Sequence, residues 1–272
     1  MLMLPRAWLD RWQERDAFDH LFAISGRVYR EYGSRKTLRF GMDGQHYFAK
    51  FHDGVGWKEI IKNIFQLRLP VTSAKNEWMA LKRLEQLGVN TACLVGYGKR
   101  GWNPAKFQSF VIMEELAGTV SLEDFCLSWS ESPPSYVLKR ALIIEVAKIA
   151  RTLHENGINH RDFYICHFLL DITGGYDCIG LRPLRLYLID LHRMQIRRRI
   201  PRRWRVKDIA GLYFSSMDIG LTKRDLLRFI RVYRDKPLKE TLKEDGKFWR
   251  QIRRRGIALY RKQLNKDPEV VL

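Results

Sequence analysis

The sequence has little of what marks a secreted, membrane-spanning or zinc-binding protein. Its 272 residues hold four cysteines, and no two of them have C-x-x-C spacing. We expect free thiols in a reducing compartment. No apolar run approaches the roughly 20 residues of a membrane span, and the first six residues lack the long apolar segment of a secretory signal. We therefore expect a cytoplasmic protein that is at most peripheral to a membrane. The cysteines are Cys93, Cys126, Cys166 and Cys178.

Acidic residues are also scarce. Lys and Arg number 49 against 30 Asp and Glu, which gives a formal charge of +19. Residues 193–272 alone hold 24 Lys and Arg against nine Asp and Glu. Such a basic surface suits an anionic partner, namely acidic lipid, nucleic acid, an acidic protein or a phosphorylated glycolipid. A merely solvated basic surface is the other interpretation.

The chain has no sequence repeat, low-complexity segment or Gly/Ser linker, and its 46% hydrophobic content is enough for a buried core. Strand patterns dominate the first part and helix patterns the second, with the change near residue 116. We predict an α+β fold in two lobes, 1–115 and 116–272, with the ligand cleft at the seam. The predicted strands are 35–40 and 45–51 around a turn at 41–44, 91–97 and 109–114. The predicted helices are 57–67 closed by Pro70, 73–87, one opening at Ser121, and 137–155.

The most informative pattern is a short motif followed by a distant acidic residue. Residues 158–167 read Ile-Asn-His-Arg-Asp-Phe-Tyr-Ile-Cys-His, and an apolar stretch at 186–189 leads to Asp190. A His-Arg-Asp triplet, a metal-binding position and an acid after an apolar strand follow one another in kinase catalytic loops. Phosphoryl transfer to a hydroxyl needs a carboxylate that orients the acceptor and takes its proton. We predict that Asp162 is this base.

Two further positions are candidate metal ligands. Asp190 follows a strand, where a carboxylate can hold Mg²⁺ against the β- and γ-phosphates of ATP. His167 lies five residues after Asp162, where kinase loops place Asn. Imidazole matches Mg²⁺ poorly, because this ion prefers oxygen. The sequence leaves open whether His167 binds metal, contacts phosphate or is structural.

The first half of the chain holds candidate nucleotide contacts. Lys50 ends a predicted strand and can bind the α- and β-phosphates, held by a helix glutamate, with Glu77 the better candidate and Glu85 the second. No G-x-G-x-x-G loop exists, and only Gly33 stands in the corresponding turn, so cations and a few backbone N–H groups would replace a glycine nest. An apolar strand ends near Glu114 and Leu116, whose backbone can bond an adenine edge. An ordinary buried strand is the alternative.

These motifs resemble the protein-kinase-like superfamily, and more closely the Kdo/WaaP family of lipopolysaccharide kinases. The resemblance covers roughly residues 25–240 and is carried by 153–170, 189–193, 201–205 and 211–217, with a weaker likeness at 59–63. It implies a kinase-like fold, ATP and Mg²⁺. It also implies phosphate transfer to a heptose of the lipopolysaccharide inner core at the cytoplasmic face of the inner membrane. His167, the Leu191-His192 pair and the missing glycine loop fit this family and argue against protein substrates.

The resemblance also suggests uses for the basic C-terminal part. Arg197, Arg199 and Arg203 would bind the anionic inner core. The tail, 223–266, would hold the enzyme on acidic lipid or receive an acidic partner such as acyl carrier protein, and we expect no nucleic-acid binding. Asp208, at the head of an apolar helix, would bond the catalytic-loop backbone.

Two other functions stay possible at this point. The chain can be another small-molecule or protein phosphotransferase of the same fold, or a kinase-shaped binding protein without turnover. Retention of Lys50, Asp162 and Asp190 together argues against the second of these.

Overall fold

The computed structural model describes residues 1–12, 17–54, 56–57, 73–103, 105–175, 179 and 183–269. The chain forms two compact units. Unit 1 comprises Met1–Gln86, Thr91–Leu116 and Leu191–Arg193, and unit 2 comprises Leu87–Asn90, Ala117–Asp190 and Met194–Leu272. Four features of the sequence lie outside the described residues, namely the predicted helix at 57–67 beyond Trp57, its closing Pro70, the segment 59–63 and Cys178.

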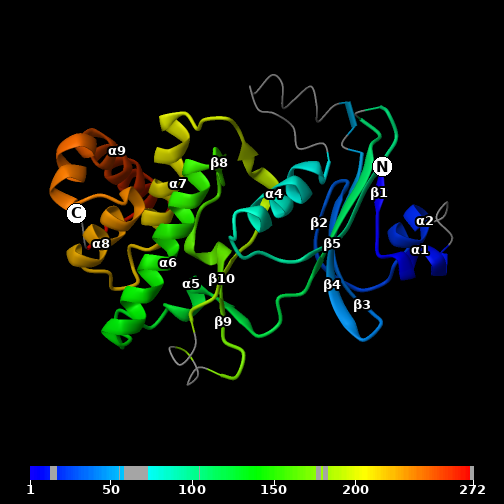
Figure 1. The fold of residues 1–272 in the computed structure, drawn as a ribbon, viewed down its shortest axis with the longest axis horizontal. Coiled ribbons are helices and arrows are strands. Elements are labelled where there is room, and N and C mark those ends of the chain that lie inside the picture. Colours follow the sequence, from blue (N-terminus) through cyan, green and yellow to red (C-terminus); the bar gives the residue numbers. More distant parts are fainter. Residues whose placement is uncertain are drawn as a thin grey trace. The chain divides into compact units, whose positions relative to one another are not determined.

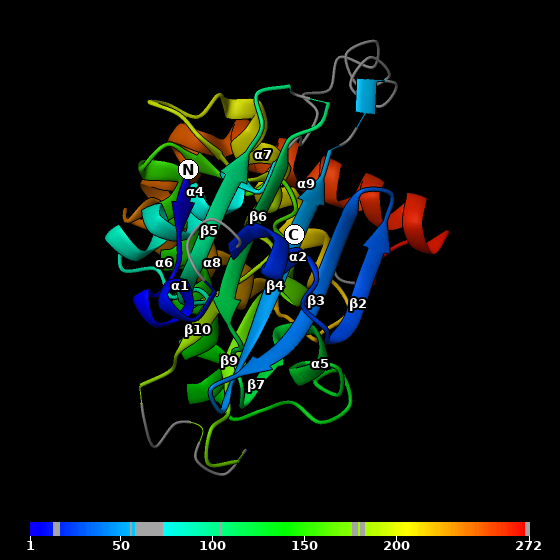
Figure 2. The same cartoon turned by 90° about the vertical axis from the view of Figure 1, so that its right-hand side faces the viewer.

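Unit 1 is built on a six-stranded antiparallel sheet with the order β1-β5-β6-β4-β3-β2 (Figures 1 and 2). Its strands are β1 (Leu2–Met3), β2 (Arg27–Tyr32), β3 (Arg35–Met42), β4 (Gln45–Asp53), β5 (Leu94–Arg100) and β6 (Gln108–Glu114). β3 runs on to Met42, so the turn that we predicted at 41–44 consists of Asp43 and Gly44 alone. Both have positive φ, 52° and 75°, as a tight hairpin turn of this kind requires.

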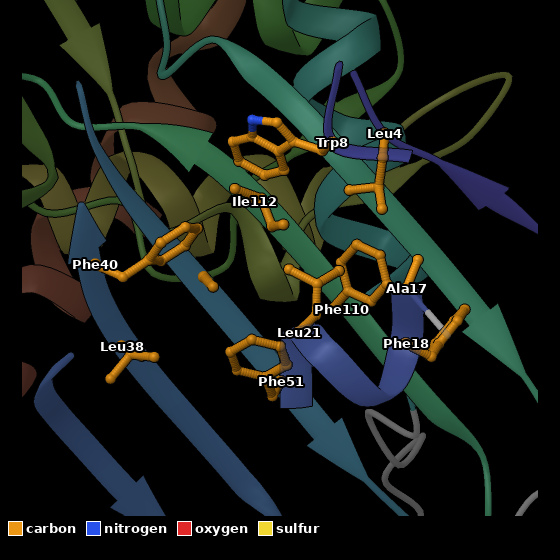
Figure 3. Packing of buried hydrophobic residues seen from close by; sticks show 11 residues of the cluster. Leu4, Trp8, Ala17, Phe18, Leu21, Leu38, Phe40, Phe51, Phe110 and Ile112 are labelled. Atoms are coloured by element: carbon orange, nitrogen blue, oxygen red, sulfur yellow. The ribbon is translucent and has the colours of Figure 1, made fainter. Parts of the chain in front are cut away.

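An apolar cluster covers one face of this sheet (Figure 3). α1 (Arg6–Trp12) contributes Trp8, and α2 (Ala17–Phe22) contributes Phe18 and Leu21. These side chains pack on residues of three neighbouring strands, and Trp8 and Phe18 make edge-to-face contacts with the rings of Phe40 and Phe110. The strand residues in the cluster are Leu38, Phe40, Ala49, Phe51, Phe110 and Ile112. Because side chains alternate along a strand, the residues between these face the other side of the sheet.

The helix α4 (Lys75–Gln86) packs on that second face. Trp78 of α4 stacks on Tyr97 of β5, with 4.7 Å between ring centroids. Gly98, the next residue of β5, lies on the cluster face, where a Cβ atom would approach the rings of Phe110 and Phe18 to 2.6 and 2.8 Å. This places Tyr97 and α4 on the opposite face. Gly88, with φ of 67°, follows α4 where the sequence predicts its end.

Unit 2 is mainly helical. α6 (Tyr136–Glu155) packs on α8 (Lys223–Arg234), and α9 (Leu238–Leu264) packs on α7 (Arg202–Ser215) and on α8. Figure 1 shows these four helices together. The other described elements of unit 2 are α5 (Leu122–Phe125), the 3₁₀ turn Ile165–His167 and the strands β7 (Thr119–Ser121), β8 (Ile158–Asn159), β9 (Phe168–Asp171), β10 (Leu186–Leu188) and β11 (Gln195–Ile196). A second 3₁₀ turn, Leu191–Arg193, belongs to unit 1.

Most predicted elements are present, with boundaries shifted by a few residues. The helix predicted at 137–155 is α6, and the helix predicted to open at Ser121 is α5, whose first turn is capped by the Ser121 side chain. The strand predicted at 91–97 is instead Leu94–Arg100. In the described part of the chain, none of the helices is both long enough and apolar enough to span a membrane.

Candidate active site

Lys50 and Glu77 form an ion pair on the second face of the unit 1 sheet. Ala49 and Phe51 point into the apolar cluster, so Lys50 between them points away from it. The Lys50 Nζ lies 2.6 Å from the Oε1 of Glu77 in α4, and only 2% of the glutamate side chain is exposed. Of the two glutamates that the sequence offered, Glu77 is therefore the one that pairs with Lys50. A buried carboxylate of this kind fixes the direction of the lysine amine, which has three N–H donors in all.

The end of β6 is fixed by a bidentate ion pair. The Nε and Nη2 of Arg39 each lie 2.8 Å from one carboxylate oxygen of Glu115. The hydrogen bonds from Arg39 hold the pKa of the Glu115 carboxyl below its usual range. The N–H of Glu114 donates to the carbonyl of Cys93, and that of Glu115 to the carbonyl of His46. These bonds define the path of the backbone that leads from Glu114 to Leu116.

Gly33 lies in the turn between β2 and β3, as the sequence predicts. The turn has two residues, Gly33 and Ser34, and Gly33 has φ of 57°. A left-handed conformation costs glycine little, and a Cβ atom here would meet no atom within 4 Å. The turn is thus short and open.

Asp208 fixes the backbone of the loop that holds Asp162 through two hydrogen bonds. The Oδ2 of Asp208 accepts the N–H of His160 at 2.7 Å, and its Oδ1 accepts the N–H of Arg161 at 2.8 Å. Arg161 has φ of 77°, a left-handed conformation that is uncommon for a residue with a side chain. The bond that we predicted between Asp208 and the loop backbone is present. Asp208 itself lies in the middle of α7, not at its head, because the helix already starts at Arg202.

A buried chain of polar groups, which the sequence did not reveal, extends behind Asp208. The Oη of Tyr233 lies 2.7 Å from the Nδ1 of His154, and the Nε2 of His154 lies 3.4 Å from the Oδ2 of Asp208. Burial raises the pKa of Tyr233, so its hydroxyl is neutral and can donate to His154. We infer that His154 in turn donates from Nε2 to Asp208. The one signal in the sequence is a histidine within the apolar stripe of α6.

Ile189, the residue before Asp190, is hydrogen-bonded to the loop of Asp162 through both its N–H and its carbonyl. The N–H of Ile189 donates to the carbonyl of His167 at 3.0 Å. The carbonyl of Ile189 lies 3.0 Å from the Nε2 of His160. Burial lowers the pKa of His160, so a neutral imidazole donates from Nε2. Asp190 follows with φ of 60°, and the loop and Asp190 are held in one hydrogen-bonded frame.

His167 is oriented so that its second nitrogen faces Asp190. Its Nδ1 lies 2.7 Å from the carbonyl oxygen of Asp162, which makes Nδ1 the donor. The Nε2 is then 3.6 Å from the Oδ2 of Asp190. An imidazole whose other nitrogen is bonded to a carbonyl is the usual arrangement of a metal-binding histidine. A carboxylate oxygen and a nitrogen lone pair that face each other fit a shared cation.

The donor set fits a metal that arrives with a nucleotide. Among the described residues, no group of three or more His, Cys, Asp or Glu side chains could hold a metal ion. Mg²⁺ commonly takes only one or two protein carboxylates and completes its octahedron with water and substrate phosphates. Asp190 with His167 therefore suits a nucleotide-dependent site better than a permanent structural one.

Two of the three predicted substrate arginines come together around Trp204 in α7. The guanidinium carbons of Arg197 and Arg203 lie 5.8 and 5.6 Å from the centroid of its ring. Arg199 is exposed and is not among the cations that contact this ring. Two further cations, Arg161 and Lys207, contact the same indole at 5.2 and 5.8 Å, although the sequence did not mark them as substrate residues. Trp204 and Lys207 are three residues apart in a helix, a spacing that could have suggested a shared face.

Comparison with known proteins identifies relatives along most of the chain. Residues 19–233 match the family described as "Lipopolysaccharide kinase (Kdo/WaaP) family". The lipopolysaccharide core heptose(I) kinase WaaP of Pseudomonas aeruginosa is 47% identical over 267 residues, which cover 98% of each chain. The protein of that name from Escherichia coli K12 is 50% identical over 244 residues, which cover 89% of this chain and 90% of that one.

A solved structure is similar in fold as well as in sequence. The structure described as "WaaP in complex with acyl carrier protein" has a TM-score of 0.81 and 44% identity, and the match covers 96% of this chain and 99% of that one. The prediction of an α+β kinase-like fold is thereby confirmed. Since the family match takes in both the Lys50–Glu77 pair and the loop around Asp162, the chain belongs to the lipopolysaccharide kinase (Kdo/WaaP) family.

Proposed function

We propose that this chain transfers the γ-phosphoryl group of ATP to a hydroxyl of a heptose in the lipopolysaccharide inner core. The observation that carries this proposal is the hydrogen-bonded frame that holds the Asp162 loop beside Asp190. The relatives named core heptose(I) kinases, at 47% and 50% identity, supply the acceptor. Another phosphotransferase of the same fold remains the alternative to be tested.

In this proposal Asp162 orients the acceptor hydroxyl and takes its proton. The hydroxyl oxygen forms a bond to the γ-phosphorus, the bond from that phosphorus to the β–γ bridging oxygen breaks, and ADP leaves with the bond's electrons. The carbonyl of Asp162 accepts the Nδ1–H of His167, and the preceding residue is fixed by Asp208. The base therefore sits in a backbone whose position is set before the acceptor arrives, which reduces the entropy lost on reaching the reactive geometry.

We assign nucleotide binding to residues 1–115 and catalysis with acceptor binding to 116–272. Lys50, held by Glu77, contacts the α- and β-phosphates. The turn at Gly33 lies near the phosphates, and the backbone at Glu114 and Leu116 bonds the adenine edge. Calorimetry tests this assignment: Lys50→Met should weaken Mg-ATP binding, and unchanged binding would remove Lys50 from the site.

Asp190 and His167 would hold Mg²⁺. Bound there, the ion supplies positive charge that balances the phosphate oxygens during transfer. Asp190 contributes the carboxylate oxygen, and the hydrogen bond from His167 to the Asp162 carbonyl fixes which of its nitrogens is offered.

The direct test is ATP consumption with purified inner-core lipopolysaccharide as acceptor. The matched control is the same lipopolysaccharide already phosphorylated on heptose. We expect turnover with the first acceptor and none above background with the second. Equal turnover with both, or turnover only with a protein or small-molecule acceptor, would move the assignment to another phosphotransferase.

We also propose that an acyl carrier protein binds unit 2 of this chain. A relative at 44% identity is described as a complex with that protein. Unit 2 contains a cavity of about 110 Å³ that is lined mainly by apolar residues of α5, α6, α7, α8 and α9 and of the segments that connect them. Examples of lining residues are Leu142, Ile209, Leu226 and Ile252. An apolar cavity suits the acyl chain of such a carrier, and the basic side chains of residues 193–272 suit its acidic surface.

Thermal stability separates this partner from a merely electrostatic contact. A ligand that binds only the folded chain raises its melting temperature in proportion to the logarithm of its concentration. We expect stabilisation by long-chain acyl carrier protein and much less by the same carrier without an acyl group. Equal effects of the two carriers would argue that the cavity is not used.

Contact with the inner membrane is the remaining part of the proposal. The acceptor is a lipid-anchored sugar, and the exposed arginines of α9, such as Arg254 and Arg255, offer charge to acidic lipid. We expect sedimentation with phosphatidylglycerol vesicles at low salt and none with phosphatidylcholine vesicles. Failure to bind the acidic vesicles would leave the acceptor itself as the membrane link.

A further inference from the structure

We propose that Trp204 organises an anion subsite for a carboxylate or phosphate group of the acceptor. The subsite is formed by Arg161, Arg203 and Lys207, together with Arg197, whose side chain is held in place by hydrogen bonds. This proposal rests on the proposed function, because it names the part of the acceptor that lies next to the phosphorylated sugar. The subsite draws on three separate segments of unit 2: the loop of Asp162, the strand β11 with its following residue, and the first half of α7.

The first observation is the number of cations on one indole. Four basic groups lie between 5.2 and 5.8 Å from the Trp204 ring centroid. An aromatic ring attracts a cation through its quadrupole over this range. Basic side chains from three segments of unit 2 are thereby gathered around one ring, which itself carries no net charge.

The second observation concerns the partners of the two arginines. The guanidinium of Arg197 donates to amide oxygens, that of Asn159 and, at 2.7 Å, that of Gln195. Both acceptors are neutral, so they orient Arg197 and leave its charge in place. Arg203 is exposed and makes no ion pair within the described part of the chain. Like charges held together repel one another, and an incoming anion relieves this repulsion.

The third observation is the composition of the α7 start. Its first turn contains arginines and no acidic residue, although acidic residues stabilise a helix at this end and cations do not. The neighbouring helix α8 follows the usual rule and has Asp225 in its first turn, within a capping box. The basic start of α7 therefore costs stability, which is expected where charge serves binding.

The fourth observation is continuity with the proposed base. Arg161 is bonded through its N–H to Asp208 and directly precedes Asp162. Lys207 directly precedes Asp208 in α7. The same helix thus positions the base loop and supplies the cations, so an anionic group bound at Trp204 would fix the acceptor relative to Asp162. This assigns Trp204 a positioning role, since it acts through the cations and not on the reacting atoms.

Binding is measured without ATP, so that the result does not depend on turnover. The probe is the deacylated inner-core oligosaccharide, titrated by calorimetry into the full chain at two salt concentrations. We expect Trp204→Leu to weaken binding at least tenfold, and Trp204→Phe, which keeps an aromatic face, to weaken it much less. Arg203→Gln should also weaken binding. Because Arg203 is exposed, this substitution does not disturb the packing of the core. The controls are Trp102→Leu and Arg140→Gln, which make the same changes at exposed sites elsewhere.

Chemical modification of the probe identifies the group that is bound. One arm uses the oligosaccharide with its carboxyl groups converted to amides, and the other uses it after phosphatase treatment. Loss of binding in one arm identifies the carboxylate or the phosphate as the ligand. Binding that survives both treatments, or that is equal in wild type, Trp204→Leu and Arg203→Gln, overturns the subsite.

The outcomes also separate this proposal from the proposed function. If the chain phosphorylates the inner core and the Trp204 and Arg203 variants keep the wild-type KM for the acceptor, the subsite is wrong and the function stands. If the variants lose oligosaccharide binding but the wild type transfers no phosphate to heptose, the subsite stands and the function is wrong.

Discussion

The backbone N–H of Arg161 is hydrogen-bonded to the buried carboxylate of Asp208 at 2.8 Å, and Arg161 has a left-handed backbone with φ of 77°. A conformation of this kind costs of order 1–3 kcal/mol and persists where its surroundings hold it. Asp208 is 1% exposed and accepts a second N–H from His160. The strained residue before the proposed base is therefore maintained by one side chain from α7.

Asp208→Asn should lower both stability and turnover. In wild type each carboxylate oxygen of Asp208 accepts one backbone N–H, from His160 or Arg161. The oxygen of asparagine can accept only one of these two, and its NH₂ group would leave the other N–H without an acceptor. A buried donor that is left without an acceptor typically costs about 1–3 kcal/mol, and more where the lost acceptor was charged. We expect a clear fall in melting temperature together with a lower kcat. Asp267→Asn, at an exposed ion pair with Arg261, is the control and should change neither. A folded Asp208→Asn with wild-type turnover would contradict the role of this bond.

Asp162→Ala should abolish most turnover while the fold is kept. The base side chain is removed, but the Asp162 carbonyl still accepts from His167 and the Asp208 bonds involve neighbouring backbone. Loss of a general base typically lowers the rate by about 10²–10⁴-fold. We expect a fall of at least ~10² in kcat with little change in Mg-ATP affinity. Near-wild-type turnover of the folded variant would remove Asp162 from this role.

The parts of the site that could be predicted from the sequence depend on local patterns. The alternation of apolar residues in β4 places Lys50 away from the cluster, and the apolar stripe of α4 places Glu77 toward the sheet. The order of His160, Asp162 and Asp190 likewise identifies the loop, because kinase chemistry fixes the spacing of its groups.

The parts that could not be predicted depend on distant segments. The chain from Tyr233 through His154 to Asp208 joins residues 79 and 54 positions apart, and no local period records such contacts. The cations at Trp204 are similarly drawn from three segments. Asp208 was misplaced at a helix start, because α7 already begins at Arg202 and arginine is a good helix former.

His167→Asn tests whether His167 ligates the metal. Asn restores the oxygen ligand that Mg²⁺ prefers. If His167 binds the metal, the variant should keep turnover and need less Mg²⁺ for half-maximal rate. Loss of the Nδ1 hydrogen bond to the Asp162 carbonyl is expected to cost about 0.5–1.5 kcal/mol of stability. Mg²⁺ titrations of rate, compared with melting curves, check both effects. A large loss of stability with an unchanged Mg²⁺ requirement would make the residue structural.

His52 should make the folded chain less stable as the pH falls below 7. Burial, with the nearby charges of Arg35 and Lys50, lowers the pKa of His52 to about 4 from its usual 6.5. The unfolded chain then binds more protons between pH 6.5 and 4, so this group's contribution is complete above pH 6.5 and is lost on acidification. From pH 7 to 5 the expected loss is about 2 kcal/mol. Denaturant unfolding of wild type and His52→Gln at both pH values checks this. Equal pH dependence of the two proteins would exclude His52 as the cause.

Arg203→Glu should stabilise the fold and weaken the binding of the acceptor. The change places a carboxylate in the first turn of α7, where the helix dipole favours it by about 0.3–1 kcal/mol, and it removes the positive charge of Arg203 from that turn. We therefore expect a higher melting temperature. The KM for the inner-core acceptor should rise and the KM for ATP should stay the same, because the nucleotide contacts that we propose lie at Lys50 and Asp190. Lys239→Glu makes the same charge reversal in the first turn of α9 and should stabilise the fold without changing the KM for ATP or for a deacylated inner-core acceptor, which has no lipid anchor. If Arg203→Glu gained stability and kept its acceptor KM, the basic start of α7 would have no part in binding, and the cost of placing arginines there would be left without the explanation that we give it.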